Sequence, residues 1–376
     1  MIELFTIIGI LSALIYLCIL LYLCIGIICT KTELTDEQPF VSVIVAAHNE
    51  AKNIGVCLDS LLNQDYPEEK MEIIIVDDRS VDDTVLILKE YEQNHKLFRA
   101  LSILEFEKGL SPKKNALTHG INIANGEIIA VTDADCRAPT QWLKKGVSYF
   151  TPTTGMVVGL APLKPTSFWM SPLMCVDAIV GSITAYGSLG WNHAVTCTGR
   201  NLFYRKKLFE EIGGFSGSDH ILMGDDDLLM MKIRKQTYWK IRFMPDGNSA
   251  VLSDAPTEWR QFISQRSRHI SASKYFPFSV KAGFGITFIS KLFIMLFVFV
   301  LLVGNGTSHL NIALIIILPY LSTFLLLIMM SIKVRQTSNI LFYPLWEIYY
   351  LLNQIMIGPL AFFGQVTWGK KVTHRY

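Results

Sequence analysis

The first thirty residues form one nearly unbroken apolar stretch. No formal charge occurs between Leu4 and Thr30, and an α-helix needs about 20 apolar residues to cross the hydrocarbon core of a bilayer. A cleaved signal peptide has a shorter apolar region, of roughly 7 to 15 residues, followed by a small-residue cleavage site. Neither feature occurs in this segment, so the pattern predicts an uncleaved transmembrane anchor over residues 1–30.

A second apolar region, between Lys291 and Lys333, is interrupted only by the polar residues 305–309. This pattern predicts a transmembrane helical hairpin over residues 286–332. The tip has no Lys or Arg, whereas basic residues follow the second helix, and basic residues tend to stay on the cytoplasmic side. We therefore expect the tip outside, residues 31–285 in the cytoplasm, and a multi-pass protein of the cell (inner) membrane.

A last apolar stretch, Phe342 to Phe363, is less regular. It contains Pro344, Glu347, Asn353, Gln354 and Pro359, and it is followed by Lys370, Lys371 and Arg375. A full span would carry these basic residues outside, so a re-entrant or interfacial segment is an alternative. Residues 333–376 are accordingly predicted to form a membrane or re-entrant segment with a basic tail.

Between these regions, short apolar runs alternate with helical patterns. Strands are predicted at Val41–Ala47, Glu72–Val76, Ala100–Leu104, Glu127–Thr132 and Met156–Leu160. Helices are predicted at Lys52–Asn63, Asp82–Asn94 and Lys113–Ala124. Fully apolar strands that alternate with helices indicate an α/β domain with a mainly parallel sheet covered on both faces. Ligands of such sheets bind beyond the carboxyl ends of the strands.

Acidic residues follow three of the predicted strands. Glu50 follows the first strand, Asp77 and Asp78 follow the second, and Asp133 and Asp135 follow the fourth. Neighbouring carboxylates repel one another unless a cation or hydrogen-bond donors offset the charge. Asp133 and Asp135 offer the hard oxygen ligands that Mg²⁺ or Mn²⁺ prefers. Any one of these residues could instead cap a helix or form a turn, but the three together favour a metal site.

Two later segments carry further candidate chemistry. Gly224 is followed by three aspartates that open a helix; helix capping and the helix dipole explain part of this run, and one aspartate could serve as a general base. Residues 257–270 read as a helix on which Gln265 and Arg268 share a face suited to a pyrophosphate. Arg266 falls on the apolar stripe, where we expect it to extend toward lipid headgroups. The alternative for this helix is a solvated basic face beside the membrane.

Composition agrees with a chain that is partly embedded in lipid. The 376 residues are 51% hydrophobic and 18% charged, and the net charge is +2. The mean hydropathy is +0.35. These values exclude intrinsic disorder and argue against nucleic acid as a partner, because phosphate binding needs clustered Lys and Arg. The seven cysteines contain no C-x-x-C pair, which indicates a reduced domain without structural zinc.

The sequence lacks two common nucleotide-binding motifs. No G-x-x-x-x-G-K-[ST] and no G-x-G-x-x-G follows a predicted strand, so P-loop and dinucleotide-binding classes have no support. Binding of a nucleoside diphosphate through a metal ion and carboxylates is the nucleotide-binding mode that stays open.

The motifs together resemble a known family. Val41–Glu50, Asp77-Asp78, Asp133–Asp135, Gly224–Asp227 and Gln265–Arg268, in this order, resemble the membrane-bound family 2 glycosyltransferases, which include cellulose, chitin and hyaluronan synthases and glycolipid-forming transferases. Cys197–Arg205 and Gly213–Phe215 are similar to the acceptor-side segment of that family. The resemblance implies a GT-A fold, a Rossmann-like α/β domain with a mainly parallel sheet, flanked by transmembrane helices. It also implies inverting transfer from a nucleotide-diphosphate sugar with a divalent metal, Mg or Mn, as cofactor.

The resemblance also assigns roles on the donor side. By similarity, Glu50 and Asp77 would contact the nucleoside, Asp133 the nucleotide and the metal, and Asp135 the metal. Lys113 or Lys114 lies where the family often places a lysine near the donor.

The remaining roles concern the reaction itself. Asp226 would be the catalytic base, with Asp225 as second choice because three consecutive aspartates blur the register. Gln265 and Arg268 would hold the diphosphate. His269 stands where the family usually has Trp, which weakens a processive activity. His48 and His119 are interpreted as neutral substitutions.

The predicted function is a membrane-bound glycosyltransferase that uses a nucleotide-diphosphate sugar and a lipid-linked, glycolipid or glycan acceptor at the cytosolic face. A processive polysaccharide synthase is one alternative, and a non-catalytic sugar-nucleotide-binding partner subunit is another. The apolar region Ser167–Gly190 is expected either to lie against membrane lipids and shape acceptor access or to pack in the core.

Overall fold

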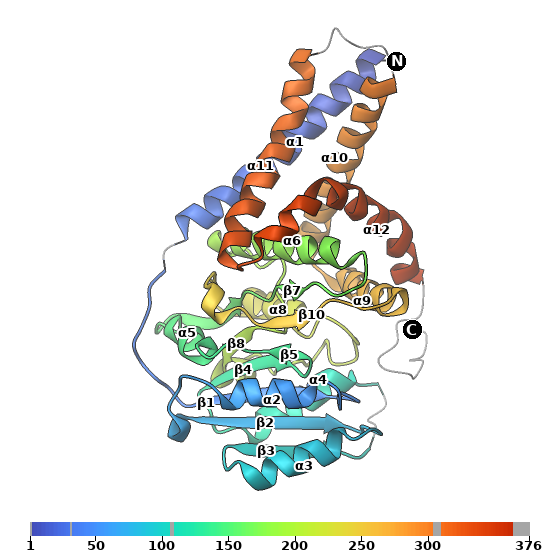
Figure 1. Cartoon of the computed structure of the whole chain (residues 1–376). Helices are drawn as coiled ribbons and strands as arrows, with labels where there is room; N and C mark the ends of the chain where they lie inside the picture. Colours follow the sequence, from blue (N-terminus) through green and yellow to red (C-terminus); the bar gives the residue numbers. More distant parts are fainter. Residues whose placement is uncertain (1, 31, 106–108, 304–309, 364–376) are drawn as a thin grey trace.

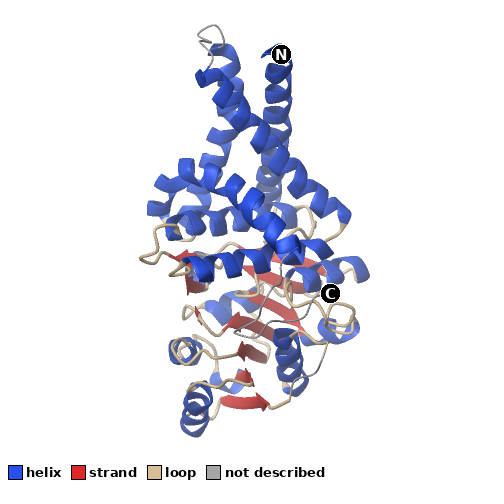
Figure 2. Ribbon diagram, turned by 90° about the vertical axis from the view of Figure 1, so that its right-hand side faces the viewer, coloured by secondary structure: helices blue, strands red, loops and turns tan. Residues whose placement is uncertain are grey.

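The structure is a computed structural model that describes residues 2–30, 32–105, 109–303 and 310–363. An α/β domain forms one end of the molecule and a group of long helices forms the other (Figure 1). Figure 2 shows the strands confined to the α/β end, with only helices beyond them.

A seven-stranded sheet organises the α/β domain, in the order β3-β2-β1-β4-β8-β6-β9. The strands are β1 (Val41–Ala47), β2 (Met71–Asp78), β3 (Phe98–Ile103), β4 (Ile128–Asp133), β6 (Thr154–Gly159), β8 (Leu202–Arg205) and β9 (Lys240–Met244). Strands β1 to β4 pair in parallel, whereas β8 runs antiparallel to both β4 and β6. The mixed, mainly parallel sheet confirms the predicted α/β class, and all five predicted strands are present.

Helices cover both faces of the sheet. The crossover helices are α2 (Ile54–Leu62), α3 (Thr84–Asn94) and α4 (Pro112–Ile123), and the later helices are α5 (Trp142–Ser148), α7 (Lys206–Glu211) and α8 (Asp227–Gln236). Side chains of β1 alternate between two cores: Ile44 packs with α4, whereas Val43 and Val45 pack with α2. This alternation is the period-two pattern of a strand buried on both faces.

A small sheet lies beside the large one. It has the order β5-β10-β7, formed by β5 (Cys136–Arg137), β10 (Leu252–Asp254) and β7 (Leu163–Lys164). The sequence patterns did not predict these strands, β8 or β9, because each is five residues or shorter and depends on its neighbours in the sheet for pairing.

Three long helices stand side by side beyond the α/β domain and form what we call the helical stalk (Figure 1). They are α1 (Ile2–Cys29), α10 (Phe278–Val303) and α11 (Leu310–Lys333). Helices α6 (Ser171–Gly190), α9 (Trp259–Ala272) and α12 (Tyr343–Phe363) lie between the stalk and the sheets. The predicted hairpin tip, 305–309, lies outside the described residues, as does the predicted basic tail after Phe363.

Within the described residues, three helices are long and apolar enough to cross a membrane, at Phe5–Cys29, Ser171–Gly190 and Phe278–Val300. The second of these is α6, which lies across the base of the stalk. Its side chains Met174, Cys175 and Val176 are nearly inaccessible, so α6 packs as a core helix over most of its surface. The predicted topology of the whole chain stays a prediction.

Candidate active site

The loops after β1 and β2 are tied to each other. The Asn49 amide donates to Ser80 Oγ at 2.8 Å, and Asn49 Oδ1 accepts from the Val81 amide at 2.8 Å. Asn49 and Arg79 both adopt left-handed backbone conformations, with φ of 57° and 58°, which turn the chain sharply at the strand ends. The two loops therefore form one continuous rim at the carboxyl edge of the sheet.

Glu50 and Asp77 occupy this rim, as the sequence predicted. Glu50 Oε2 accepts from Asn53 Nδ2 at 2.8 Å. Desolvation, together with the charges of Asp135 and Asp133, raises the pKa of Glu50 to about 7 against the opposing hydrogen bond from Asn53, so these carboxylates share one electrostatic environment. Asp77 is 2% exposed, and within the described residues its Oδ1 has no hydrogen-bond partner. A buried acceptor of this kind fits a ligand that brings its own donor, such as a nucleobase.

Asp133 and Asp135 form the candidate metal centre. Their carboxylate oxygens and Cys136 Sγ lie within 4.8 Å of one another. The Cys136 thiol is buried, which raises its pKa well above its usual range, and it donates to Asp135 Oδ1 at 3.4 Å. The protonated thiol is a poor ligand, so the two carboxylates are the donor set. Hard oxygen ligands fit Mg²⁺ or Mn²⁺.

Lys113 joins the candidate metal centre to the triple aspartate. Its Nζ lies 2.8 Å from Asp133 Oδ1 and 3.0 Å from Asp225 Oδ2. Although burial opposes its charge, Asp133 and Asp225 raise the pKa of Lys113 well above its usual value. Desolvation works against ionisation of Asp133, but the Lys113 ammonium lowers its pKa overall. Two segments 92 residues apart in the sequence are thus held together by one charged side chain.

The structure also separates Lys113 from Lys114, which the sequence left as alternatives. Lys114 is 1% exposed and its ammonium donates to the carbonyl oxygens of Ser218 and Ile221, at 2.6 and 2.9 Å. Of the two lysines, Lys113 is the one that is ion-paired with Asp133 and Asp225.

Asp226 caps the N-terminus of α8. Its Oδ1 accepts from the Asp227 amide at 2.8 Å and its Oδ2 from the Gly199 amide at 2.6 Å. Asp227 Oδ1 accepts from the Cys197 amide at 2.8 Å. The segment Cys197–Gly199 therefore holds two carboxylates in place through its backbone. At Gly199 a Cβ would lie 3.3 Å from Asp225 Oδ2, so a side chain there would crowd the carboxylates.

The three aspartates differ in their electrostatics. Desolvation raises the pKa of Asp226 to about 6, and the charge of Asp225 adds to the shift. Burial raises the pKa of Asp227 well above its usual range. Asp225 is ion-paired with Lys113. With a pKa of about 6, the Asp226 carboxylate is ionised at neutral pH and still close to its pKa, which suits a general base.

Helix α9 carries both Gln265 and Arg268. Both side chains are half-buried and lie one turn apart. Burial lowers the pKa of Arg268, while Asp133 and Asp135 act in the opposite direction. The Arg268 guanidinium therefore lies within electrostatic range of the candidate metal centre.

The expectation for Arg266 is wrong. Instead of extending toward lipid headgroups, Arg266 is ion-paired through Nη1 with Asp177 of α6, and its guanidinium stacks over the Tyr349 ring of α12 at 5.6 Å. Asp177 also accepts from Trp346 Nε1 at 3.1 Å. Arg266 points inward because Asp177 supplies the countercharge that a buried guanidinium requires.

Sequence reasoning missed one cation of the site. Arg200, between the Asp226-binding segment and β8, donates from Nη1 to Ser253 Oγ at 2.6 Å. Its charge acts on both Asp133 and Asp135. Hydrophobic periodicity does not identify an arginine of this kind, although Arg200 lies within the segment that resembles the acceptor side of the family.

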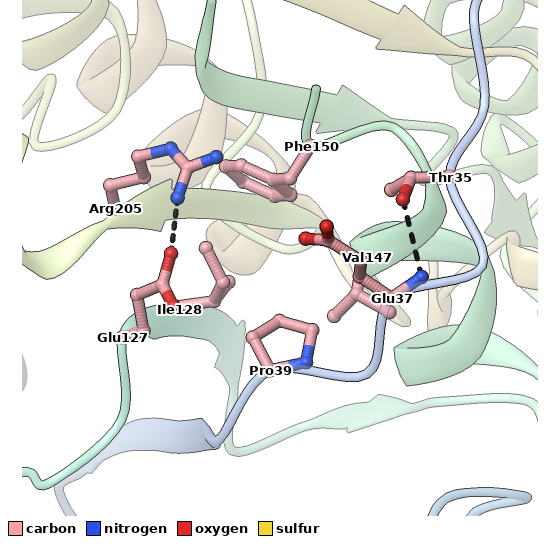
Figure 3. A pocket seen from close by; sticks show the side chains of 8 residues that line it. All are labelled: Thr35, Glu37, Pro39, Glu127, Ile128, Val147, Phe150 and Arg205. Carbon is pink, nitrogen blue, oxygen red and sulfur yellow. Dashed lines mark hydrogen bonds and ion pairs between the residues drawn. The ribbon is translucent and has the colours of Figure 1, made fainter. Parts of the chain in front are cut away.

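A pocket at the opposite edge of the sheet is separate from this site (Figure 3). It is lined by Thr35, Glu37, Pro39, Glu127, Ile128, Val147, Phe150 and Arg205. The Arg205 guanidinium is ion-paired with Glu127 and donates to the carbonyl oxygen of Thr154 at 2.9 Å. This pocket lies at the amino ends of β1 and β4. The linker that leads to β1 is held there by the Thr35 amide, which donates to the Ser148 carbonyl at 2.8 Å, and by the Tyr66 hydroxyl, which donates to the Pro39 carbonyl.

Two models of known protein families match the chain. The model of glycosyl transferase family 2 matches residues 42–213, and the model of glycosyl transferase family group 2 matches residues 128–337. The second match covers more than half of the chain. The chain therefore belongs to the family 2 glycosyltransferases, as the ordered motifs had indicated.

Two curated relatives show how far the similarity extends. Glycosyltransferase AglE of Haloferax volcanii is 31% identical over 193 residues, which is 51% of this chain and 60% of AglE. The beta-monoglucosyldiacylglycerol synthase of Synechocystis sp. is 37% identical over 237 residues, which is 60% of this chain and 47% of the synthase. The chain thus spans 60% or less of the length of either relative.

Among solved structures, the mannosyltransferase PcManGT from Pyrobaculum calidifontis, in complex with GDP-Man and Mn²⁺, has a TM-score of 0.60. The alignment covers 93% of this chain and 99% of that one at 18% sequence identity. At this identity the similarity establishes the fold, which is GT-A.

Proposed function

We propose that this chain is a membrane-bound, metal-dependent, inverting glycosyltransferase. It moves a hexosyl-type sugar from a nucleotide-diphosphate sugar to a hydroxyl of a lipid-linked, glycolipid or glycan acceptor at the cytosolic face. The observation that carries the proposal is the Lys113 bridge, with Nζ at 2.8 Å from Asp133 and 3.0 Å from Asp225. This bridge joins the carboxylates that suit a metal ion and the sugar donor to the carboxylates that suit the proton released by the acceptor.

The acceptor proton goes to Asp226. As the acceptor oxygen forms its bond to the anomeric carbon, the bond from that carbon to the diphosphate breaks and the configuration inverts. Asp226 takes the hydroxyl proton, and its pKa of about 6 allows this at neutral pH. The Gly199 and Asp227 amides fix both of its oxygens, so the carboxylate is already oriented before the acceptor arrives.

The departing nucleoside diphosphate gains negative charge. Asp133 and Asp135 would hold a divalent cation, which neutralises part of this charge when it is bound. Arg268 and Arg200 place two guanidinium groups in the field of the same carboxylates, and Gln265 adds an amide donor. Glu50 and Asp77 would position the nucleoside at the neighbouring rim.

The apolar helices support attachment to a membrane. Two of the three candidate spans, Phe5–Cys29 and Phe278–Val300, belong to the stalk. Because α6, α9 and α12 lie between the stalk and the sheets (Figure 1), the site would sit close to the bilayer surface. A lipid acceptor would need this placement, and the Synechocystis relative is named as a glycolipid synthase.

A processive polysaccharide synthase is the second candidate. The poly-beta-1,6-N-acetyl-D-glucosamine synthase of Staphylococcus epidermidis is 30% identical over 179 residues, which is 46% of this chain and 41% of the synthase. Product length separates the two: one sugar per acceptor supports single transfer, and a ladder of products supports processive synthesis.

The first experiment follows nucleoside diphosphate release from a panel of UDP- and GDP-sugars. It uses the full chain in native-lipid nanodiscs with added lipid extract, and with Mg²⁺ or Mn²⁺. We expect release with one donor, lost after EDTA treatment and lost in Asp135→Ala. Donor binding without release under every condition would instead favour a non-catalytic partner subunit.

A further inference from the structure

The loop over residues 213–224 leads directly to the triple aspartate. It connects α7 to α8 and contains four glycines in left-handed conformations, Gly213, Gly214, Gly217 and Gly224. Such a glycine-rich segment loses much conformational entropy when it is held in one conformation. Contacts from outside the loop must therefore fix the position of the aspartates that follow it.

Lys114 makes the central contact with this loop. Its ammonium donates to the carbonyl oxygens of Ser218, Ile221 and Met223, at 2.6, 2.9 and 3.4 Å. These three bonds use all three donors of an ammonium group. A lysine that is 1% exposed loses its hydration, and the carbonyl oxygens replace the water.

Ser111, at the start of α4, adds two further bonds. Its amide donates to the Asp219 carbonyl at 2.6 Å and its Oγ to the Leu222 carbonyl at 3.2 Å. The first turn of α4 thus binds five carbonyl groups of one short loop. On its other side the loop packs through Ile221 and Met223 against the residues where α9 ends and α10 begins, Ala272, Phe276 and Val280.

We propose that Lys114 is a positioning residue that holds this loop so that the Asp226 carboxylate meets the acceptor hydroxyl. The inference rests on the proposed function, in which Asp226 is the base. Lys113 faces the carboxylates directly, whereas its neighbour Lys114 fixes the backbone that carries them. The charged groups around the Lys114 ammonium are Asp219, Asp225, Asp226 and Lys113.

Lys114→Met removes the ammonium but keeps most of the side-chain volume. The loop carbonyls lose their donor and the loop shifts, and a displacement of about 1 Å can cost about a hundredfold in rate. We therefore expect kcat to fall by about tenfold or more, with the donor KM close to that of the wild type. Loss of a nearby positive charge also moves the acid limb of kcat to higher pH, because it raises the pKa of Asp226.

The test compares Lys114→Met and Lys114→Gln with the control Lys206→Met, all as full chains in nanodiscs. Lys206 donates from Nζ to the Ala124 carbonyl at 2.7 Å, at the opposite end of α4, so its loss removes a similar lysine–carbonyl bond away from the loop. The kcat and the donor KM from rates over a range of donor concentrations, the pH profile of kcat, and nucleoside diphosphate binding are measured for each protein. The proposal would be supported if Lys114→Met has a reduced kcat, an acid limb of the kcat profile shifted to higher pH, and retained nucleoside diphosphate binding. Lys114→Gln should then recover part of the lost kcat.

Two results would overturn it. If Lys114→Met keeps the wild-type kcat and pH profile, Lys114 has no positioning role. If both Lys114 variants lose nucleotide binding together with turnover, the residue supports the whole fold instead. Asp226→Asn is measured in parallel: wild-type turnover in that variant refutes the base assignment itself, which separates failure of the proposed function from failure of this inference.

Discussion

Asp226 is the residue on which the proposed chemistry depends most directly. Its carboxylate is held by two backbone amides, and asparagine is close to it in shape but cannot accept the acceptor proton. We expect Asp226→Asn to lower kcat by about 10²- to 10⁴-fold, the usual contribution of a general base. Nucleoside diphosphate binding, measured by titration calorimetry, should be retained. The exposed linker variant Asp36→Asn serves as the control and should keep wild-type kcat.

The pKa of Asp226, raised to about 6 mainly by desolvation, gives a pH dependence. Only the deprotonated form accepts a proton, so kcat should fall as the pH drops through about 6 and level off above it. Glu50, with a pKa of about 7, would act through donor binding and should appear in kcat/KM. Rates at saturating donor from pH 5 to 8 separate the two groups; a kcat that stays constant across this range contradicts the assignment.

Among the helices, α9 is held to α6 and α12 through one aspartate. Asp177 pairs with Arg266 and also accepts from Trp346, and Arg266 lies between Gln265 and Arg268 on α9. The pair is partly buried, with side chains 14% and 24% exposed, so removing one partner should cost less than the roughly 3 to 5 kcal/mol that is typical of a fully buried pair. We therefore expect Asp177→Asn to lower the Tm and to weaken nucleoside diphosphate binding.

The matched control for Asp177→Asn is Asp65→Asn. Asp65 pairs with Lys144 at 2.8 Å, and both side chains are about half exposed, at 51%. Exposed pairs contribute about 0 to 1 kcal/mol, so this variant should leave Tm and nucleotide binding nearly unchanged. Equal effects of the two substitutions would show that Asp177 does not position α9.

Helices α1 and α6 approach each other through glycines. A Cβ at Gly187 of α6 would lie 2.7 Å from the Leu23 carbonyl oxygen of α1, whereas a Cβ at Gly181 of the same helix would meet nothing within 4 Å. We expect Gly187→Ala to separate the helices and lower the Tm. Gly181→Ala should be neutral or stabilising by up to about 1 kcal/mol, since alanine favours a helix. Thermal unfolding in nanodiscs compares the two variants.

At the scale of the whole molecule, the proposed function requires the catalytic domain and the hairpin tip on opposite sides of the membrane. In intact cells, a membrane-impermeant maleimide should label Thr307→Cys above the wild-type level. Glu68→Cys, on the α/β domain, should react only after the cells are opened. Labelling of Glu68→Cys in intact cells would contradict the predicted orientation.

The sequence predicted well those helices and strands whose formation depends on the composition of their own residues. The apolar runs of β1 and β2 are buried on both faces, so their composition alone identified them. The helices between the first four strands carry a regular apolar periodicity. By contrast, β9 has five residues and is defined by pairing with β6, a contact between segments more than 80 residues apart, which local periodicity does not report.

The candidate site divides in the same way. The sequence by itself determined the α/β class and the edge at which the acidic residues lie, and it singled out Asp133, Asp135 and the triple aspartate as candidates, because strand ends and acidic runs are local features. Only the tertiary structure decided which of Lys113 and Lys114 faces the carboxylates, that Arg266 turns inward to Asp177, and that Arg200 joins the site. These outcomes depend on where distant charges meet in space, and a countercharge decides the direction of a long side chain more strongly than its place on a helical stripe.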